Sequence, residues 1–286
     1  MRIQLLSDLH LETQPGFRAT AVADADVLVL AGDIGSYQAG SRLPDVQPRD
    51  FGLSQFAARS KGGRWPLVLY VPGNHEYDGG DFDAIHAELR GVAESLGMVW
   101  LERECFVHRG VRFVGTTLWS DFDALVMQAD PPPTLARQLK MREKAYRAAN
   151  FYLSKTGTVR GGQPFLADEI RTQALVCQQW LEQALAEPFD GPTVAITHFA
   201  PSLRSADPRY GLVPGTAGFC SALDHLLPRA DVWMHGHLHC LNRYAVPAPG
   251  RIGGECRVVS NALGYAAKNE QETFDPLFTV TLPLPV

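Results

Sequence analysis

Short apolar segments alternate with longer amphipathic ones along most of this chain, and this alternation restricts the fold more than any other feature. Six segments of three to five residues are rich in Val, Ile and Leu, and most end at or just before a polar residue or a glycine: Arg2–Leu6, Val27–Ala31, Leu67–Val71, Val111–Gly115, Val194–Thr197 and Val232–Met234. Continuous apolar runs of this length are typical of strands buried on both faces. The sequence therefore predicts a sheet that is covered on both sides.

Two longer segments, Phe82–Leu96 and Ala167–Leu185, carry apolar residues three and four positions apart, as amphipathic helices do. From about Arg243 onward, strand-like segments follow one another between Pro and Gly turns, namely Tyr244–Val246, Arg257–Val259 and Leu277–Leu282. The first part predicts βαβ units and the last part antiparallel additions. Together they predict a mixed α/β sandwich. The length of 286 residues fits one large domain, 1–286.

Two segments fit this scheme poorly. Gly35–Asp50 is rich in Gly, Pro, Ser and Arg and is expected to be a long surface loop. The segment at about 119–162 passes three consecutive prolines, 131–133, and continues as a basic helical stretch with Arg137, Lys140, Arg142, Lys144 and Arg147. Two interpretations stay open here: a solvent-exposed helix face, or a helical cap inserted over an active site.

The composition excludes several classes of protein. Hydrophobic residues make up 45% and charged residues 20%, as in ordinary globular proteins, so disorder and coiled coil are excluded. The net charge is 26 − 31 = −5, which argues against a broad nucleic-acid-binding surface. The five cysteines are scattered without a CxxC pair, so neither a disulfide framework nor a thiolate zinc site is expected. No apolar run approaches 18 residues, and we expect a cytoplasmic protein without a membrane span.

Polar side chains follow the predicted strands at the points where those strands end. The groups, in chain order, are Asp8 and His10, then Asp33, then Asn74 and His75, then His198, and finally His237 and His239. In α/β sheets the carboxyl ends of parallel strands face a common crevice, so these groups are expected to meet there.

The set combines carboxylates, an amide carbonyl and several imidazoles, without a thiolate. Manganese, iron or zinc suits such a mixture, whereas magnesium or calcium would call for more oxygen ligands. The ligands are too many for one metal, and they would serve two ions if one carboxylate bridges them. A two-metal site is the usual apparatus for in-line displacement at phosphorus. Gly32, Gly73 and Gly236 precede ligands in this set, and are expected to let the backbone turn sharply.

The ordered motifs DxH, GD, GNHE, H and GHxH resemble those of the calcineurin-like metallophosphoesterase superfamily, from Asp8 to His239. The start LLSDLHLE and the segment Thr197–Pro201 are similar to the small bacterial phosphoesterases of that superfamily. The resemblance implies a four-layer αββα sandwich of two mixed β-sheets flanked by helices. It also implies one metal held by Asp8, His10, Asp33 and His239, and another held by Asp33, Asn74, His198 and His237, with Asp33 bridging. The same resemblance makes His75 the proton donor to the leaving group.

Departures from the family patterns narrow the activity. The protein phosphatases of the superfamily continue GD as GDxxDRG, which is absent after Asp33. The lipid A pathway hydrolases carry Arg in place of His75, and the retromer subunit of similar fold has lost that histidine and acts as a scaffold. The presence of His75 therefore favours a working enzyme.

The resulting hypothesis is a binuclear metal-dependent phosphoesterase, with a phosphodiester favoured over a phosphomonoester and a metal-bridging hydroxide as nucleophile. The first alternative is a metal-dependent nuclease acting on DNA or RNA, for which the basic segment Arg137–Arg147 is the candidate groove. The second is a metal-binding interaction module without turnover. A small phosphate ester is the expected substrate, whose identity the sequence does not specify; neither does it specify the metals in the cell nor the oligomeric state.

The four other histidines are not assigned to the site. His86, His108 and His225 are expected to be partly exposed structural residues. His235 has two open interpretations: it hydrogen-bonds a ligand and holds its tautomer, or it merely ends a strand.

Overall fold

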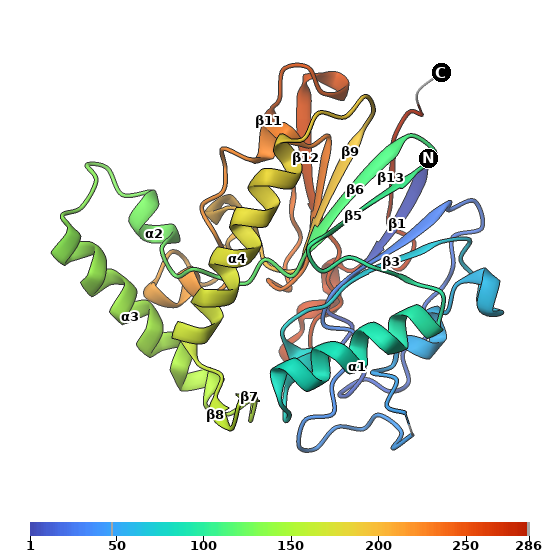
Figure 1. The fold of residues 1–286 in the computed structure, drawn as a ribbon, viewed down its shortest axis with the longest axis horizontal. Coiled ribbons are helices and arrows are strands. Elements are labelled where there is room, and N and C mark those ends of the chain that lie inside the picture. Colours follow the sequence, from blue (N-terminus) through green and yellow to red (C-terminus); the bar gives the residue numbers. More distant parts are fainter. Residues whose placement is uncertain (47, 285–286) are drawn as a thin grey trace.

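Two β-sheets pack face to face between helices in the computed structural model, which describes residues 1–46 and 48–284 (Figure 1). The first sheet has the order β13-β1-β2-β3-β4. Its strands are Thr279–Thr281, Arg2–Leu6, Val27–Ala31, Val68–Val71 and Val99–Trp100. The second has the order β11-β12-β10-β9-β6-β5. Its strands are Arg243–Pro247, Glu255–Ser260, Val232–His235, Thr193–Thr197, Val111–Thr116 and Glu104–His108. Two short strands, β7 (Val159–Arg160) and β8 (Gln163–Pro164), form a separate antiparallel hairpin.

Helices cover the outer faces of both sheets. Helix α1 (Phe82–Ser95) lies beside the first sheet and α4 (Ala167–Ala186) beside the second (Figure 1). Two further helices, α2 (Ala124–Met127) and α3 (Leu135–Leu153), lie at one end of the molecule. The four-layer αββα arrangement expected from the sequence is thus confirmed, and the six apolar segments form strands close to their predicted bounds.

Alternation within the strands explains why both faces are apolar. Ile3 and Val29 of the first sheet and Phe113, Ile196 and Met234 of the second bury in one cluster between the sheets. The residues that alternate with them point the other way because successive strand side chains face opposite sides. Leu28 and Leu30, for example, share a second cluster with Ile85 and Leu89 of α1.

The prediction of antiparallel additions at the C-terminal end is wrong for one strand. β12 pairs in parallel with β10, whereas β11 pairs antiparallel with β12 and β13 pairs antiparallel with β1. The reason is topological. The chain crosses from β10 to the sheet edge at β11, turns back through a hairpin, and inserts β12 between them, so β12 must run in the direction of β10.

The segment at about 119–162 contains α2 and α3. Ala145 is the buried residue of α3, and the basic side chains of that helix mostly lie in solvent. Arg142 instead forms two hydrogen bonds of 2.7 and 2.8 Å with Asp123, which also accepts a 2.7 Å bond from Arg171 of α4. These ion pairs fasten α3 to the body, while its role as a cap stays a prediction.

The Gly35–Asp50 segment contains neither helix nor strand among its described residues; residue 47 lies outside them. Among the helices in the described ranges, none has the length and apolarity needed to cross a membrane.

Packing between the sheets leaves no room at Gly115 of β6. A Cβ there would lie 2.6 Å from Leu101 Cβ and 2.8 Å from the Leu101 carbonyl oxygen. We expect Gly115→Ala to lower the free energy of unfolding by about 1–3 kcal/mol because the core must shift to accept the methyl group. Gly91→Ala is the matched control: nothing lies within 4 Å of its Cβ position on the exposed side of α1, so this change should raise stability by about 0.5–1 kcal/mol. Urea unfolding of both variants measures the difference, and equal stabilities would contradict the packing argument.

Candidate metal centre

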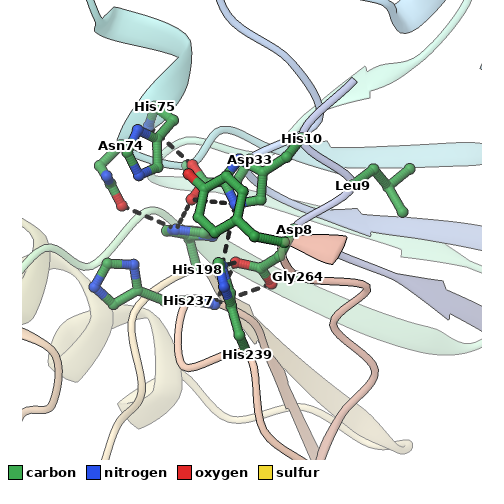
Figure 2. Close-up of polar contacts among 12 residues, drawn as sticks. Asp8, Leu9, His10, Asp33, Asn74, His75, His198, His237, His239 and Gly264 are labelled. Carbon is green, nitrogen blue, oxygen red and sulfur yellow. Dashed lines mark hydrogen bonds and ion pairs between the residues drawn. The ribbon is translucent and has the colours of Figure 1, made fainter. Parts of the chain in front are cut away.

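The polar residues that follow the strands converge at one edge of the two sheets. Asp8 and His10 come from the end of β1, Asp33 from β2, Asn74 and His75 from β3, His198 from β9, and His237 and His239 from β10. Figure 2 shows their side chains pointing toward one another. Two groups have possible ligand atoms within 4.8 Å of one another: Asp8, His10, Asp33 and His239 form one, and Asp33, His198 and His237 form the other.

The backbone at these positions is strained. Asp8, His10, Asp33, His237 and His239 all have positive φ, between 45° and 71°. A non-glycine residue in this region costs on the order of 1–3 kcal/mol and persists where the surrounding structure imposes it. The fold therefore accepts strain at five of the candidate ligands in order to aim their side chains at one point.

The three glycines before the ligands act in two ways. Gly32 has φ +85°, as expected for a sharp turn. Gly73 and Gly236 do not have positive φ; a Cβ on Gly73 would collide with the Asp33 carboxylate, and one on Gly236 would lie 2.5 Å from Asp8 Oδ2. The positive φ that requires glycine is thus present at Gly32, whereas Gly73 and Gly236 are glycine because the carboxylates of Asp33 and Asp8 approach the backbone there.

Hydrogen bonds at Nδ1 orient three of the imidazoles. His10 Nδ1 lies 3.0 Å from Glu12 Oε1, His198 Nδ1 lies 2.8 Å from the Ala31 carbonyl oxygen, and His239 Nδ1 lies 2.6 Å from Glu270 Oε2. Carboxylate and carbonyl oxygens only accept, so each Nδ1 carries the hydrogen. In the neutral ring this leaves Nε2 with a free lone pair.

These lone pairs face other lone pairs. His10 Nε2 lies 3.1 Å from His239 Nε2, and His198 Nε2 lies 3.1 Å from Asn74 Oδ1 and 3.2 Å from Asp33 Oδ2. Such contacts repel unless a proton or a metal ion lies among the atoms. Protons and metals compete for the same sites, so metal binding here releases protons.

Two buried polar atoms also support metal binding at this centre. Asp33 Oδ2 and His237 Nε2 are shielded from solvent and make no hydrogen bond among the described residues. A buried polar atom without a partner is costly unless something else binds it. The donor set of imidazole nitrogens, carboxylate oxygens and one amide oxygen fits manganese, iron or zinc.

The electrostatics reflect the close packing of opposite charges. Burial alone would raise the pKa of Asp8, but the hydrogen bond and charge of His239 outweigh it and lower the pKa to about 2. Burial alone would lower the pKa of His198, but the negative charge of Asp33, whose Oδ2 lies 3.2 Å from His198 Nε2, outweighs it and raises that pKa to about 9. Burial and the charge of His198 instead lower the pKa of His237, which keeps that ring neutral and able to donate a lone pair.

His75 lies at the more open side of the centre. Its side chain is 27% exposed, whereas those of Asp8, His10 and His198 are fully buried. Its Nδ1 lies 2.5 Å from the buried carboxylate of Asp78, and its ring centroid is 5.2 Å from that of His10. Burial lowers the pKa of His75, but the charges of Asp78 and Asp33 outweigh it and raise the pKa to about 10. The Asp78 carboxylate thus holds the ring beside the candidate ligands.

Sequence reasoning missed the carboxylates that hold these ligands. Glu76 accepts hydrogen bonds from the backbone N–H groups of Asp33, Ile34 and Gly73, at 2.9 to 3.2 Å, and joins the two ligand loops. Its place in GNHE was the one available signal. Glu12 ends the segment LLSDLHLE but was given no role there, and Glu270 stands in no motif; their carboxylates contact His10 and His239 at Nδ1.

The unassigned histidines lie outside the two ligand groups. His235 does not contact a ligand side chain; its Nδ1 lies 3.0 Å from the Gly236 carbonyl oxygen and its Nε2 lies 3.1 Å from Ser205 Oγ. It therefore braces the backbone before the GHxH turn. His86 lies 2.9 Å from the Tyr77 hydroxyl through its Nδ1, and His225 is exposed.

Glu270 offers a test of ligand orientation. We expect Glu270→Gln to weaken metal binding about 10- to 100-fold, because the amide holds His239 Nδ1–H less firmly than the carboxylate does. Glu272→Gln, an exposed glutamate of the same short helix Glu270–Thr273, should leave affinity unchanged. Competition of each variant with a chelating dye measures the affinity. Equal affinities for the two variants would show that the hydrogen bond does not matter.

Comparisons with known proteins agree with the geometry. The chain matches the family of calcineurin-like phosphoesterases over residues 1–241. A solved phosphopantetheinyl hydrolase from Mycobacterium tuberculosis has a similar fold, with 18% identity and a TM-score of 0.64 over 97% of this chain and 95% of that one. The search of curated proteins finds no match. The match over 1–241 covers most of the sequence and includes every candidate ligand, and the chain therefore belongs to the calcineurin-like phosphoesterase family.

Proposed function

We propose that this chain hydrolyses a small phosphodiester at a centre of two metal ions. Membership of the family makes it a metal-dependent phosphoester hydrolase. The observation that carries the finer proposal is the position of Asp33, whose carboxylate belongs to both groups of possible ligands. Asp8, His10 and His239 would complete one ion's ligands, and Asn74, His198 and His237 the other's. Two bound cations supply Lewis-acid chemistry, polarising phosphate oxygens and lowering the pKa of water.

The protein's own part in catalysis is to position groups and to move a proton. His75 stands beside the ligand groups on their open side, and Asp78 accepts from its Nδ1. This leaves the opposite ring nitrogen, Nε2, to donate a proton to the departing oxygen. A positioned general acid contributes roughly 100- to 10,000-fold to such a step.

The lack of a bond from Lys or Arg to the described site side chains favours a diester over a monoester. Among the described residues, no Lys or Arg forms a hydrogen bond or ion pair with the ligand side chains or with His75. An arginine that binds two phosphate oxygens at once would suit the second negative charge of a monoester. A diester carries one charge and needs no such partner.

The described surface gives less support to nucleic acid as the substrate. On α3, Arg142 is engaged by Asp123, and Arg147 lies 3.8 Å from Glu143. The helix therefore presents a partly neutralised face rather than a continuous basic groove of the kind that tracks a phosphate backbone.

We also propose a cytoplasmic location. All five cysteines are unpaired, and three of them, Cys177, Cys220 and Cys256, are buried. Free buried thiols without disulfides suit a reducing compartment.

Asp33→Asn tests the bridging role. We expect the variant to bind fewer than two metal ions per chain, because an amide supplies one neutral oxygen where the carboxylate serves both groups. Asp45→Asn, in the exposed loop, is the control and should retain the metal content of the unmodified protein. Metal analysis of both purified variants decides the matter. Two ions bound per chain by Asp33→Asn would exclude the bridge.

His75→Ala tests the proton donor. We expect full metal content, with turnover lowered roughly 100- to 10,000-fold on diesters with an alkoxide leaving group. The loss should be much smaller on a 4-nitrophenyl ester, whose leaving group hardly needs a proton. The exposed His225→Ala is the control and should leave both rates unchanged. Equal losses on the two esters would assign His75 another role.

A further inference from the structure

An exposed aromatic ring stands beside the metal centre without a role in holding it. Phe219 is 42% exposed, and its ring centroid lies 5.2 Å from that of His237, with 33° between the planes. Phe199 also packs against His237, at 4.0 Å and 29°, but is 3% exposed. Phe199 therefore serves the core, whereas Phe219 keeps a large part of its surface in solvent next to a ligand.

The backbone around Phe219 is anchored on both sides. It follows the short helix η5 (Pro214–Gly218), in which the Thr216 hydroxyl accepts from Val213 N–H and donates to the Gly211 carbonyl oxygen, both at 3.1 Å. After Phe219, Cys220 is fully buried, and Ser221 N–H donates to the Ala200 carbonyl oxygen at 2.9 Å. Ala200 lies two residues beyond His198. The same strand end thus positions a candidate ligand and the segment that carries the ring.

The partly exposed side of the candidate centre includes His237, the neighbour of this ring. Asp8, His10, Asp33 and His198 are buried, whereas Asn74, His75, His237 and His239 are partly exposed. An ester that reaches the ligands must approach past the partly exposed group, and Phe219 borders that group at His237.

The ring and the proton donor lie on different sides of the centre. His75 neighbours His10, with ring centroids 5.2 Å apart, while His237, the neighbour of Phe219, lies 5.0 Å from His198. Figure 2 shows His75 and His237 on separate sides of the cluster. With His75 as the proposed proton donor, the leaving group would depart on the His75 side, and Phe219 would lie nearer the organic group that stays on phosphorus.

We propose that Phe219 forms an apolar subsite that selects esters carrying an aromatic or similarly flat group on the phosphorus. This inference rests on the proposed function of the centre. A rigidly held ring with one face in water gains from stacking because the contact removes apolar surface from solvent without ordering a mobile loop. Phosphate oxygens at the metals would fix one end of the substrate, and the ring would hold the other.

Binding of two phosphonates tests the subsite without turnover. With manganese present, phenylphosphonate should bind the unmodified protein more tightly than methylphosphonate in titration calorimetry. In Phe219→Ala this preference should fall roughly 5- to 100-fold, the usual cost of losing an aromatic stacking partner. Phe219→Tyr should retain most of the preference. No preference in the unmodified protein, or an unchanged preference in Phe219→Ala, would overturn the proposal.

Tyr210→Ala is the matched control. Tyr210 is 64% exposed in the turn before η5, and its ring contacts Arg209 rather than a ligand. This variant should leave the preference unchanged. Metal content and melting temperature of each variant show whether the site and the fold persist; if Phe219→Ala does not fold, Phe219→Leu replaces it and should also lower the preference, because Leu lacks the flat face.

Hydrolysis of two esters with the same leaving group separates this inference from the proposed function. Phenyl 4-nitrophenyl phosphate should be preferred over methyl 4-nitrophenyl phosphate in kcat/KM, and Phe219→Ala should remove that preference. Hydrolysis of both esters with a ratio that Phe219→Ala does not change would overturn the subsite and leave the function standing. A phosphonate preference that depends on Phe219, without hydrolysis of either ester, would overturn the function and support the subsite.

Discussion

The centre exists only where the two sheets meet, and the site depends on contacts that cross between them. Asp8, from the first sheet, accepts a hydrogen bond of 2.9 Å from the backbone N–H of His237, from the second. His198 Nδ1 donates across the same boundary to the Ala31 carbonyl oxygen at the end of β2. Neither sheet alone carries a complete set of ligands. The apolar cluster between the sheets, with Leu5, Val29 and Ile196 fully buried, therefore positions the candidate metal ligands as well as stabilising the fold.

Hydrogen bonds to a layer of carboxylates behind the candidate ligands offset the free-energy cost of backbone strain and polar burial at this edge. Three carboxylates each accept a hydrogen bond from an imidazole Nδ1, namely those of Glu12, Glu270 and Asp78. Glu76 accepts hydrogen bonds from three backbone N–H groups of the neighbouring ligand loops. The bonds to Nδ1 fix the orientation of each ring, which could otherwise adopt several rotamers. Such support is what distinguishes a functional constellation from polar residues that happen to lie close together. It also explains how five left-handed non-glycine residues are tolerated in one small region.

Much of the fold was predictable because strands buried on both faces must be apolar throughout. The segments Val27–Ala31 and Val194–Thr197 were readable for that reason, and so were α1 and α4, whose apolar stripes face the sheets. Strand β5 (Glu104–His108), the hairpin partner of β6, could not be predicted in this way. It lies at the edge of the sheet and keeps polar and exposed residues such as Glu104 and Cys105. The parallel pairing of β12 was missed because strand direction depends on where the chain re-enters a sheet, which no local pattern records.

The sequence by itself determined which residues could serve as ligands, since DxH, GD, GNHE and GHxH stand at the ends of apolar strands that share one edge. Only the tertiary structure decided how each of them is used. It set the Nδ1 partner of each imidazole, gave His235 a backbone role rather than a ligand contact, and placed Phe219 beside His237 across more than fifteen residues of chain. The physical reason is that a strand's own sequence specifies which of its residues are buried and how they alternate. The hydrogen-bond partners and ring contacts at its end come from segments distant in the chain. Those contacts exist only once the two sheets have packed.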